Sequence, residues 1–101
     1  MSLHERLYDE TERVQVRFVG FVSGNGRYDF GIVYTRMFFG KPLVVCLQTG
    51  RSSLLSQDDI DNLDHIQRVY CLKSRNEAEE VSNFLHHNVP HLSMEAEAES
   101  G

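Results

Sequence analysis

The sequence lacks the features that mark secreted and membrane-spanning proteins. It has two cysteines, Cys46 and Cys71, which are too few for a disulfide framework and do not have metal-ligand spacing. No apolar run approaches the roughly 20 residues that a membrane-spanning helix needs. The first ten residues lack the apolar core of a signal peptide. We therefore expect free thiols, no membrane segment and a cytoplasmic location.

The sequence also lacks the positive charge of a protein that coats nucleic acid. The formal net charge is -5, whereas non-specific binding to phosphate backbones relies on positive charge. The charge is uneven, however, because residues 13–56 contain six basic residues and one acidic residue. A basic sheet could bind single-stranded nucleic acid, or its arginines could simply be solvated. No RNA-binding signature accompanies them, so we consider nucleic acid an unlikely partner.

The length of 101 residues and the apolar fraction of 41% predict one folded domain with a single core. We place this domain at residues 1–92. The remaining residues, 93–101, read SMEAEAESG, have little to bury and are expected to be a disordered acidic tail.

The first half of the chain has the alternation of β-strands. Residues 13–22 and 28–35 each place apolar side chains on one parity, and the Asn-Gly pair at 25–26 between them favours a hairpin turn. A turn centred on Asn25 would place Phe18 opposite Ile32 on one packed face. Residues 42–48 read PLVVCLQ and predict a third strand, which would add Val45 to the same face.

The second half predicts shorter elements and one clear helix. Residues 52–56 predict a fourth strand, and Ser56 with Asp59 predicts the start of a short helix. The β-branched and aromatic residues of 65–72 favour a further strand. Ser74 and Glu77 have the spacing of a capping box before a helix that Pro90 ends. The fold class is therefore α+β, an antiparallel meander of three to four strands plus a further strand, with a short middle helix and a C-terminal helix on one sheet face.

The predicted register leaves apolar side chains on the second sheet face. They are Val19, Phe21, Val33, Val44 and Cys46. An uncovered apolar patch of this kind needs a partner. The cover could be the short helix near Ile60 and Leu63, the N-terminal segment 3–8, or the same face of another copy. Our leading hypothesis is a non-enzymatic interaction or regulatory module that forms a homodimer through these residues, because no convergent catalytic set is evident.

The TGRSS segment at 49–53 is the best candidate for a ligand site. A nucleotide-binding P-loop needs Gly-Lys-Ser/Thr before a helix, and that motif is absent from the sequence. The segment is first of all typical of a turn, in which Gly50 supplies backbone freedom and Thr49 or Ser52 bonds locally. A charge-assisted contact from Arg51 could still hold a carboxylate or phosphate. The alternative function is therefore small-ligand or anion binding by a set of seven residues: Arg17, Gln48, Thr49, Gly50, Arg51, Ser52 and Ser53.

The histidines and acidic residues do not have the spacing of a metal site. His86 and His87 are adjacent on the predicted helix and diverge by about 100°, and His91 follows Pro90. The acidic run at 58–64 lacks the spacing of a calcium-binding loop. We predict no metal and no cofactor.

Four blocks in order carry a resemblance to a known family: VRFVGF, YDFGIVYT, FFGKPLVV and QTGR. From about residue 5 to residue 88, the chain resembles a family of small cytosolic proteins from Firmicutes with no characterised function. The resemblance implies a bacterial intracellular protein. It implies no catalytic or binding residues.

Overall fold

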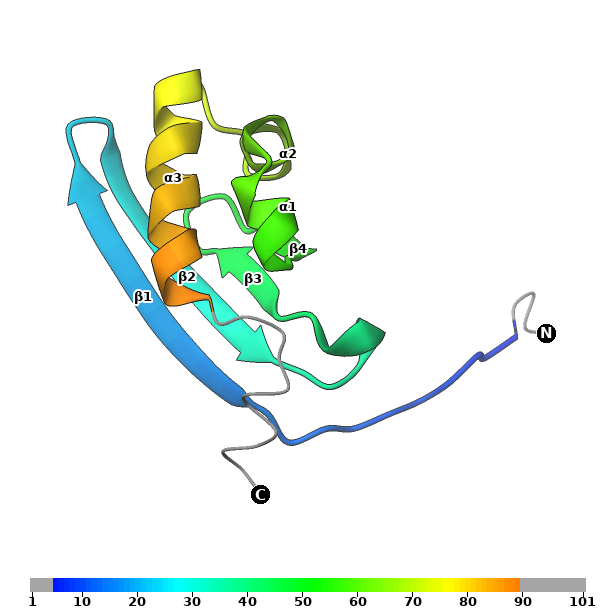
Figure 1. Cartoon of the computed structure of the whole chain (residues 1–101). Helices are drawn as coiled ribbons and strands as arrows, with labels where there is room; N and C mark the ends of the chain where they lie inside the picture. Colours follow the sequence, from blue (N-terminus) through cyan, green and yellow to red (C-terminus); the bar gives the residue numbers. More distant parts are fainter. Residues whose placement is uncertain (1–4, 90–101) are drawn as a thin grey trace.

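The computed structural model describes residues 5–89 as an antiparallel sheet with helices on one face (Figure 1). The strands are β1 (Gln15–Ser23), β2 (Gly26–Tyr34), β3 (Leu43–Cys46) and β4 (Ser52–Leu54), in the spatial order β1-β2-β3-β4. A 3₁₀ turn, η1 (Phe38–Gly40), joins β2 to β3, and the helices are α1 (Gln57–Asp61), α2 (Leu63–Val69) and α3 (Arg75–Asn88). This architecture confirms the α+β class and the four-stranded meander. The division at residue 92 and the tail 93–101 lie outside the described residues.

The helix starts follow the predicted capping residues. The Ser56 hydroxyl accepts a hydrogen bond from the backbone N–H of Asp59, and the Asp59 carboxylate accepts one from the backbone N–H of Ser56. At α3, the Ser74 hydroxyl accepts from the backbone N–H of Glu77. These contacts satisfy N–H groups that have no partner inside a helix.

The strand predicted within residues 65–72 is wrong, because residues 63–69 form α2. Asn62 caps this helix by accepting from the backbone N–H of His65. Ile66 and Tyr70 are both fully buried, and their separation of four residues is the helical spacing. The buried apolar residues of this segment therefore have the spacing of a helix, although the β-branched and aromatic residue types favoured a strand.

The predicted strand register is wrong by one residue. Ser23 pairs with Gly26, so the turn contains only Gly24 and Asn25, and Phe18 lies opposite Gly31 rather than Ile32. The β2–β3 pairing is displaced in the same way, with Ile32 opposite Val44. Because side chains alternate with a period of two, each displacement moves a strand's apolar set to the other face.

The displacement changes which residues form the core. Phe18, Ile32 and Val45 do not share a layer: Ile32 is fully buried beneath the helices, whereas Phe18 is 71% exposed on the opposite face. Four of the five residues predicted for an interface face the helices instead: Val44 and Cys46 are buried, and Val19 and Phe21 pack against the core. Only Val33 lies on the uncovered face, where it pairs with Val16 and Leu43.

The observed register predicts opposite consequences for two neighbouring phenylalanines. Phe21→Ala should lower the free energy of unfolding by about 3 kcal/mol, because it removes a ring packed under α3. Phe18→Ala should change it by less than about 0.5 kcal/mol in dilute protein, because that ring is exposed. Urea unfolding at low protein concentration measures both values. A larger loss for Phe18→Ala than for Phe21→Ala would contradict this register.

Candidate functional site

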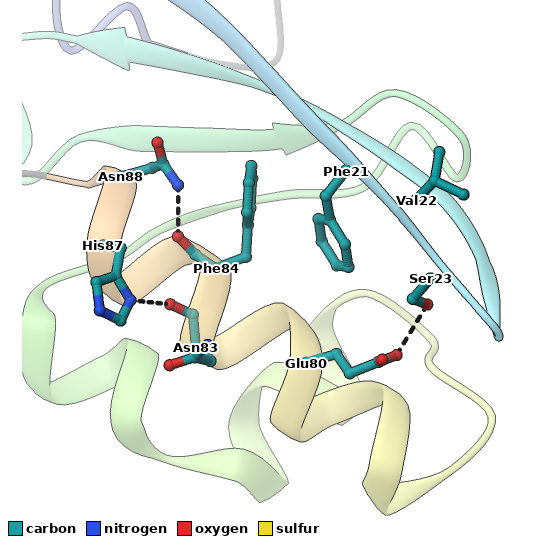
Figure 2. A pocket seen from close by; sticks show the side chains of 8 residues that line it. All are labelled: Phe21, Val22, Ser23, Glu80, Asn83, Phe84, His87 and Asn88. Atoms are coloured by element: carbon teal, nitrogen blue, oxygen red, sulfur yellow. Dashed lines mark hydrogen bonds between the residues drawn. The ribbon is translucent and has the colours of Figure 1, made fainter.

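A groove between β1 and α3 is the first candidate site (Figure 2). It has a volume of about 440 Å³. Two aromatic rings line it, those of Phe21 and Phe84, whose centroids are 4.6 Å apart. The buried ring of Tyr28 stacks on Phe21 behind them, with centroids 5.0 Å apart.

The polar groups of this groove already have partners within the chain. The Glu80 carboxylate accepts from Ser23 Oγ at 3.0 Å and from Asn25 Nδ2 at 2.8 Å. His87 Nδ1 lies 2.8 Å from the carbonyl oxygen of Asn83, as Figure 2 shows. Arg17 donates to the carbonyl oxygen of Asn88 at 3.0 Å. The contacts of Glu80 and Arg17 attach the β1–β2 hairpin to α3, whereas the His87 contact lies within α3. The carboxylate and the imidazole of the groove are therefore held by different partners.

A buried polar pair fixes α3 to the sheet beside this groove. The Tyr28 hydroxyl donates to the carboxylate of Glu77, which also accepts from the backbone N–H of Lys73. Both hydrogen bonds favour the ionised carboxylate and lower the pKa of Glu77, against the opposing effect of burial. Burial, followed by the hydrogen bond to Glu77, raises the pKa of Tyr28 to about 12. The pair is therefore a neutral phenol and a carboxylate at neutral pH.

The face of the sheet opposite the helices is the second candidate site, and we call it the open face. One row of side chains crosses all four strands, in the order Val16, Val33, Leu43 and Leu54. The next row is Phe18, Gly31, Val45 and Ser52. The Phe18 ring covers Gly31, since a Cβ atom placed on Gly31 would lie 3.3 Å from the ring. The open face is thus an apolar surface built from every strand.

Polar groups border the open face at both ends. At the end nearest η1, the Glu12 carboxylate accepts from Thr35 Oγ1 at 2.5 Å and from the backbone N–H of Arg36 at 2.8 Å. At the other end, Asp29 accepts from Arg27 Nε at 2.8 Å and from Gln48 Nε2 at 2.6 Å. An apolar centre with a polar rim is the anatomy of a protein–protein interface.

The open face contains a depression, the apolar hollow, at the η1 end. Its volume is about 430 Å³, and it is lined by Glu12, Val14, Val33, Thr35, Phe38, Leu43 and Leu54. Of these residues, only Val33 belongs to the set that was predicted from the sequence to form an interface. The alternation of Val14, Val16 and Phe18 is visible in the sequence. The predicted register, which is wrong by one residue, placed these residues under the helices instead of on the open face.

The residues predicted to bind an anion do not all come together. Arg17 belongs to the edge strand β1 and contacts α3, whereas the Thr49–Ser53 segment leads into β4 at the opposite edge. Gln48 is held by Asp29. Within 49–53, the backbone N–H of Arg51 donates to Thr49 Oγ1, and Gly50 has a φ of 73°, the left-handed conformation that glycine adopts readily. The segment has the geometry of a turn between two strands.

Both cysteines are free thiols, with Cys46 buried and Cys71 exposed. His86 contacts Asp61 and His87 contacts Asn83, so the two imidazoles are held by different partners. His91 lies outside the described residues. Within residues 5–89, no three His, Cys, Asp or Glu side chains gather in a way that could hold a metal ion. Within the same range, no helix has the length and hydropathy to cross a membrane.

Comparison with known protein families places most of the chain in one of them. The model of a family described as SAV0927-like matches residues 7–87, which include the four sequence blocks and all strands and helices up to the last turn of α3. A search of curated proteins finds no significant match. The family description states no activity, so the match transfers no functional residue to this chain.

The Tyr28–Glu77 pair predicts a specific dependence of stability on pH. Because the folded pKa of Glu77 is below its ordinary value of 4.5, its contribution is present above that value and is lost as the pH falls through the folded pKa. Glu77→Gln should therefore lower stability at neutral pH and reduce the loss between about pH 7 and about pH 3.

Urea midpoints of the native chain and the variant across this range provide the measurement. Three other carboxylates, those of Glu12, Asp29 and Asp59, also have lowered pKa values. They titrate in both proteins, so their contributions to the pH dependence of stability cancel in the difference between the two curves. Parallel curves for the two proteins would show that Glu77 does not contribute as described.

Proposed function

We propose that this chain, which belongs to the SAV0927-like family, is a non-enzymatic interaction module whose open face binds the open face of a second copy. The observation that carries the proposal is the apolar surface formed by all four strands on the side without helices. Phe18 and Val22 are 71% and 77% exposed there, and Val14 and Val16 are also exposed.

The helices cover only one of two apolar sheet faces. Apolar patches larger than a few hundred Å² are uncommon on monomers and usually mark interaction sites. Burial of such a patch contributes roughly 25 cal/mol per Å² of apolar surface, which favours association. Among residues 5–89, the chain's own candidates for cover do not supply it: Ile60 is in the core on the helix side, and Leu7 is exposed.

A second copy suits this surface because the open face is self-complementary. In a twofold dimer each copy offers the same patch, so an apolar centre meets an apolar centre. The area is limiting, however. Four strands of 9, 9, 4 and 3 residues that lie about 4.8 Å apart give a face on the order of 400 Å². Standard interfaces bury about 800 Å² on each partner, so a stable dimer needs further contacts.

The proposal also includes the cellular location and the origin of the protein. Two thiols that are not joined in a disulfide are consistent with a reducing cytoplasm. The four sequence blocks support a bacterial origin within the Firmicutes.

The proposal predicts the effect of a charge at the centre of the open face. Phe18→Arg should convert a dimer into a monomer at micromolar concentration, because a guanidinium would be buried between two apolar faces without a partner. Light scattering coupled to size-exclusion chromatography measures the mass.

The matched control is Asn76→Arg, which adds the same charge at an exposed position on α3 that lies outside both candidate sites. It should leave the dimer intact. A native chain that is monomeric throughout the accessible concentration range would refute self-association, and a dimer that is insensitive to Phe18→Arg would refute the open face as its interface.

A further inference from the structure

Building on the proposed self-association, we propose that the two copies exchange their N-terminal arms. The N-terminal arm is defined as residues 5–11. In this arrangement the arm of each copy lies in the apolar hollow of the other copy, with Leu7 and Tyr8 as its anchoring side chains.

The arm extends away from its own domain. Figure 1 shows it as the dark blue segment that leads from the start of β1 away from both the sheet and the helices. Leu7 is 88% exposed and Tyr8 is 55% exposed. Among the described residues, the side-chain hydrogen bond recorded for the arm is internal to it, from Arg6 Nη1 to Asp9 Oδ2 at 3.2 Å. Within residues 5–89, two large apolar side chains in succession are thus left largely exposed.

The root of the arm is held in place, and this sets its direction. Glu12 is bound by the hydroxyl of Thr35 and the backbone N–H of Arg36 at the end of β2. These hydrogen bonds, led by that of Thr35, lower the pKa of Glu12, so the anchor is ionised at neutral pH. Leu7 is five residues from this anchor, and residues 7–11 contain neither glycine nor proline to reverse the chain. The geometry therefore favours a hollow on another copy over the chain's own.

The apolar hollow is flanked by unusual aromatic residues. Phe38, which lines it, and the adjacent Phe39 both have left-handed backbone conformations, with φ of 53° and 66°. Such conformations are unfavourable for residues with a Cβ atom. Phe39 is nevertheless 94% exposed. Backbone strain that places aromatic rings in water is a feature of binding sites rather than of cores.

Charge and size also match the arm to the hollow. The arm, residues 5–11, contains three acidic residues and one basic residue. The exposed Arg13 and Arg36 flank the hollow, and the one carboxylate that lines it, that of Glu12, is already hydrogen-bonded to Thr35 and Arg36. The two are therefore attracted electrostatically. The volume of about 430 Å³ lies within the range of about 300–1,000 Å³ that is typical of ligand pockets. Exchanged arms would add the buried area that the open face lacks.

The family match includes most of the N-terminal arm. The matched region begins at residue 7, so it includes both proposed anchors. The arm from residue 7 onward is thus part of the sequence region that defines the family.

Disulfide trapping between two distinguishable chains tests the exchange directly. One chain carries Leu7→Cys and an affinity tag, and the other carries Phe38→Cys. Both also carry Cys71→Ser, and the native Cys46 is buried. After mixing and mild oxidation, we expect a disulfide-linked pair of tagged and untagged chains. The matched control replaces Phe38→Cys with Val22→Cys, an exposed site towards the hairpin end of the same face, and should give little product.

Equal trapping at both sites, or none in a protein that is dimeric, would overturn the exchange. Rapid trapping within a single chain that carries both Leu7→Cys and Phe38→Cys, without trapping between chains, would show that the arm folds back on its own domain. That result would also overturn it.

A second measurement separates this inference from the proposed function on which it rests. The double variant Leu7→Ser/Tyr8→Ser changes two exposed side chains and should fold normally, yet it should raise the dimer dissociation constant about tenfold or more. An unchanged constant would reject arm exchange and leave the open-face dimer standing. A native chain that is monomeric at every concentration would reject the dimer itself.

Discussion

The two-residue turn between β1 and β2 is the constraint on which the rest of the structure depends. Ser23 pairs with Gly26, and this single pairing decides which side chains of β1 face the helices. Val19 and Phe21 are placed under α3, and Val16 and Phe18 are placed on the opposite face. One residue more in the turn would reverse this assignment along the whole strand. The core and the open face are therefore two consequences of one hairpin.

The helix layer stabilises one side of the sheet through polar as well as apolar contacts. Tyr70 donates from α2 to the carbonyl oxygen of Val44 at 2.8 Å, and Ser82 donates from α3 to that of Ile60 at 2.7 Å. With the Tyr28–Glu77 pair, these bonds fix the helices to β2, β3 and one another. The chain has no comparable layer for the other side among its described residues. A second copy, including its arm, would supply that layer.

Much of the fold could be predicted from local sequence signals. The cap at Ser56 and the start of α3 at Ser74 depend on residues three positions apart, and such short-range spacing is readable directly. The α+β class followed from strand alternation and the last helix. The segment 65–72 was harder, because Ile66 and Val69 are β-branched and favour strands, yet tertiary packing against the core determined a helix.

The candidate site could not be predicted with the same success, and the reason is physical. Both parities of β1 are apolar, since Val19 and Phe21 alternate with Val16, Phe18 and Val22. Parity alone therefore cannot say which set is buried. Arg17, which was predicted to bind an anion, lies on the helix side and donates to the carbonyl oxygen of Asn88 at the end of α3. An apolar second face was expected from the sequence, but its members were assigned from the wrong register.

The central claim is that the Phe18 side of the sheet is exposed in one chain and covered in the assembly. Nuclear magnetic resonance with a dissolved paramagnetic agent measures this for individual side chains. The account predicts that signals of Val16 and Phe18 are strongly broadened in dilute protein and protected in concentrated protein, while those of Ile32 are protected at both. Equal broadening of Phe18 at all concentrations, or protection of Phe18 in the dilute monomer, would contradict it.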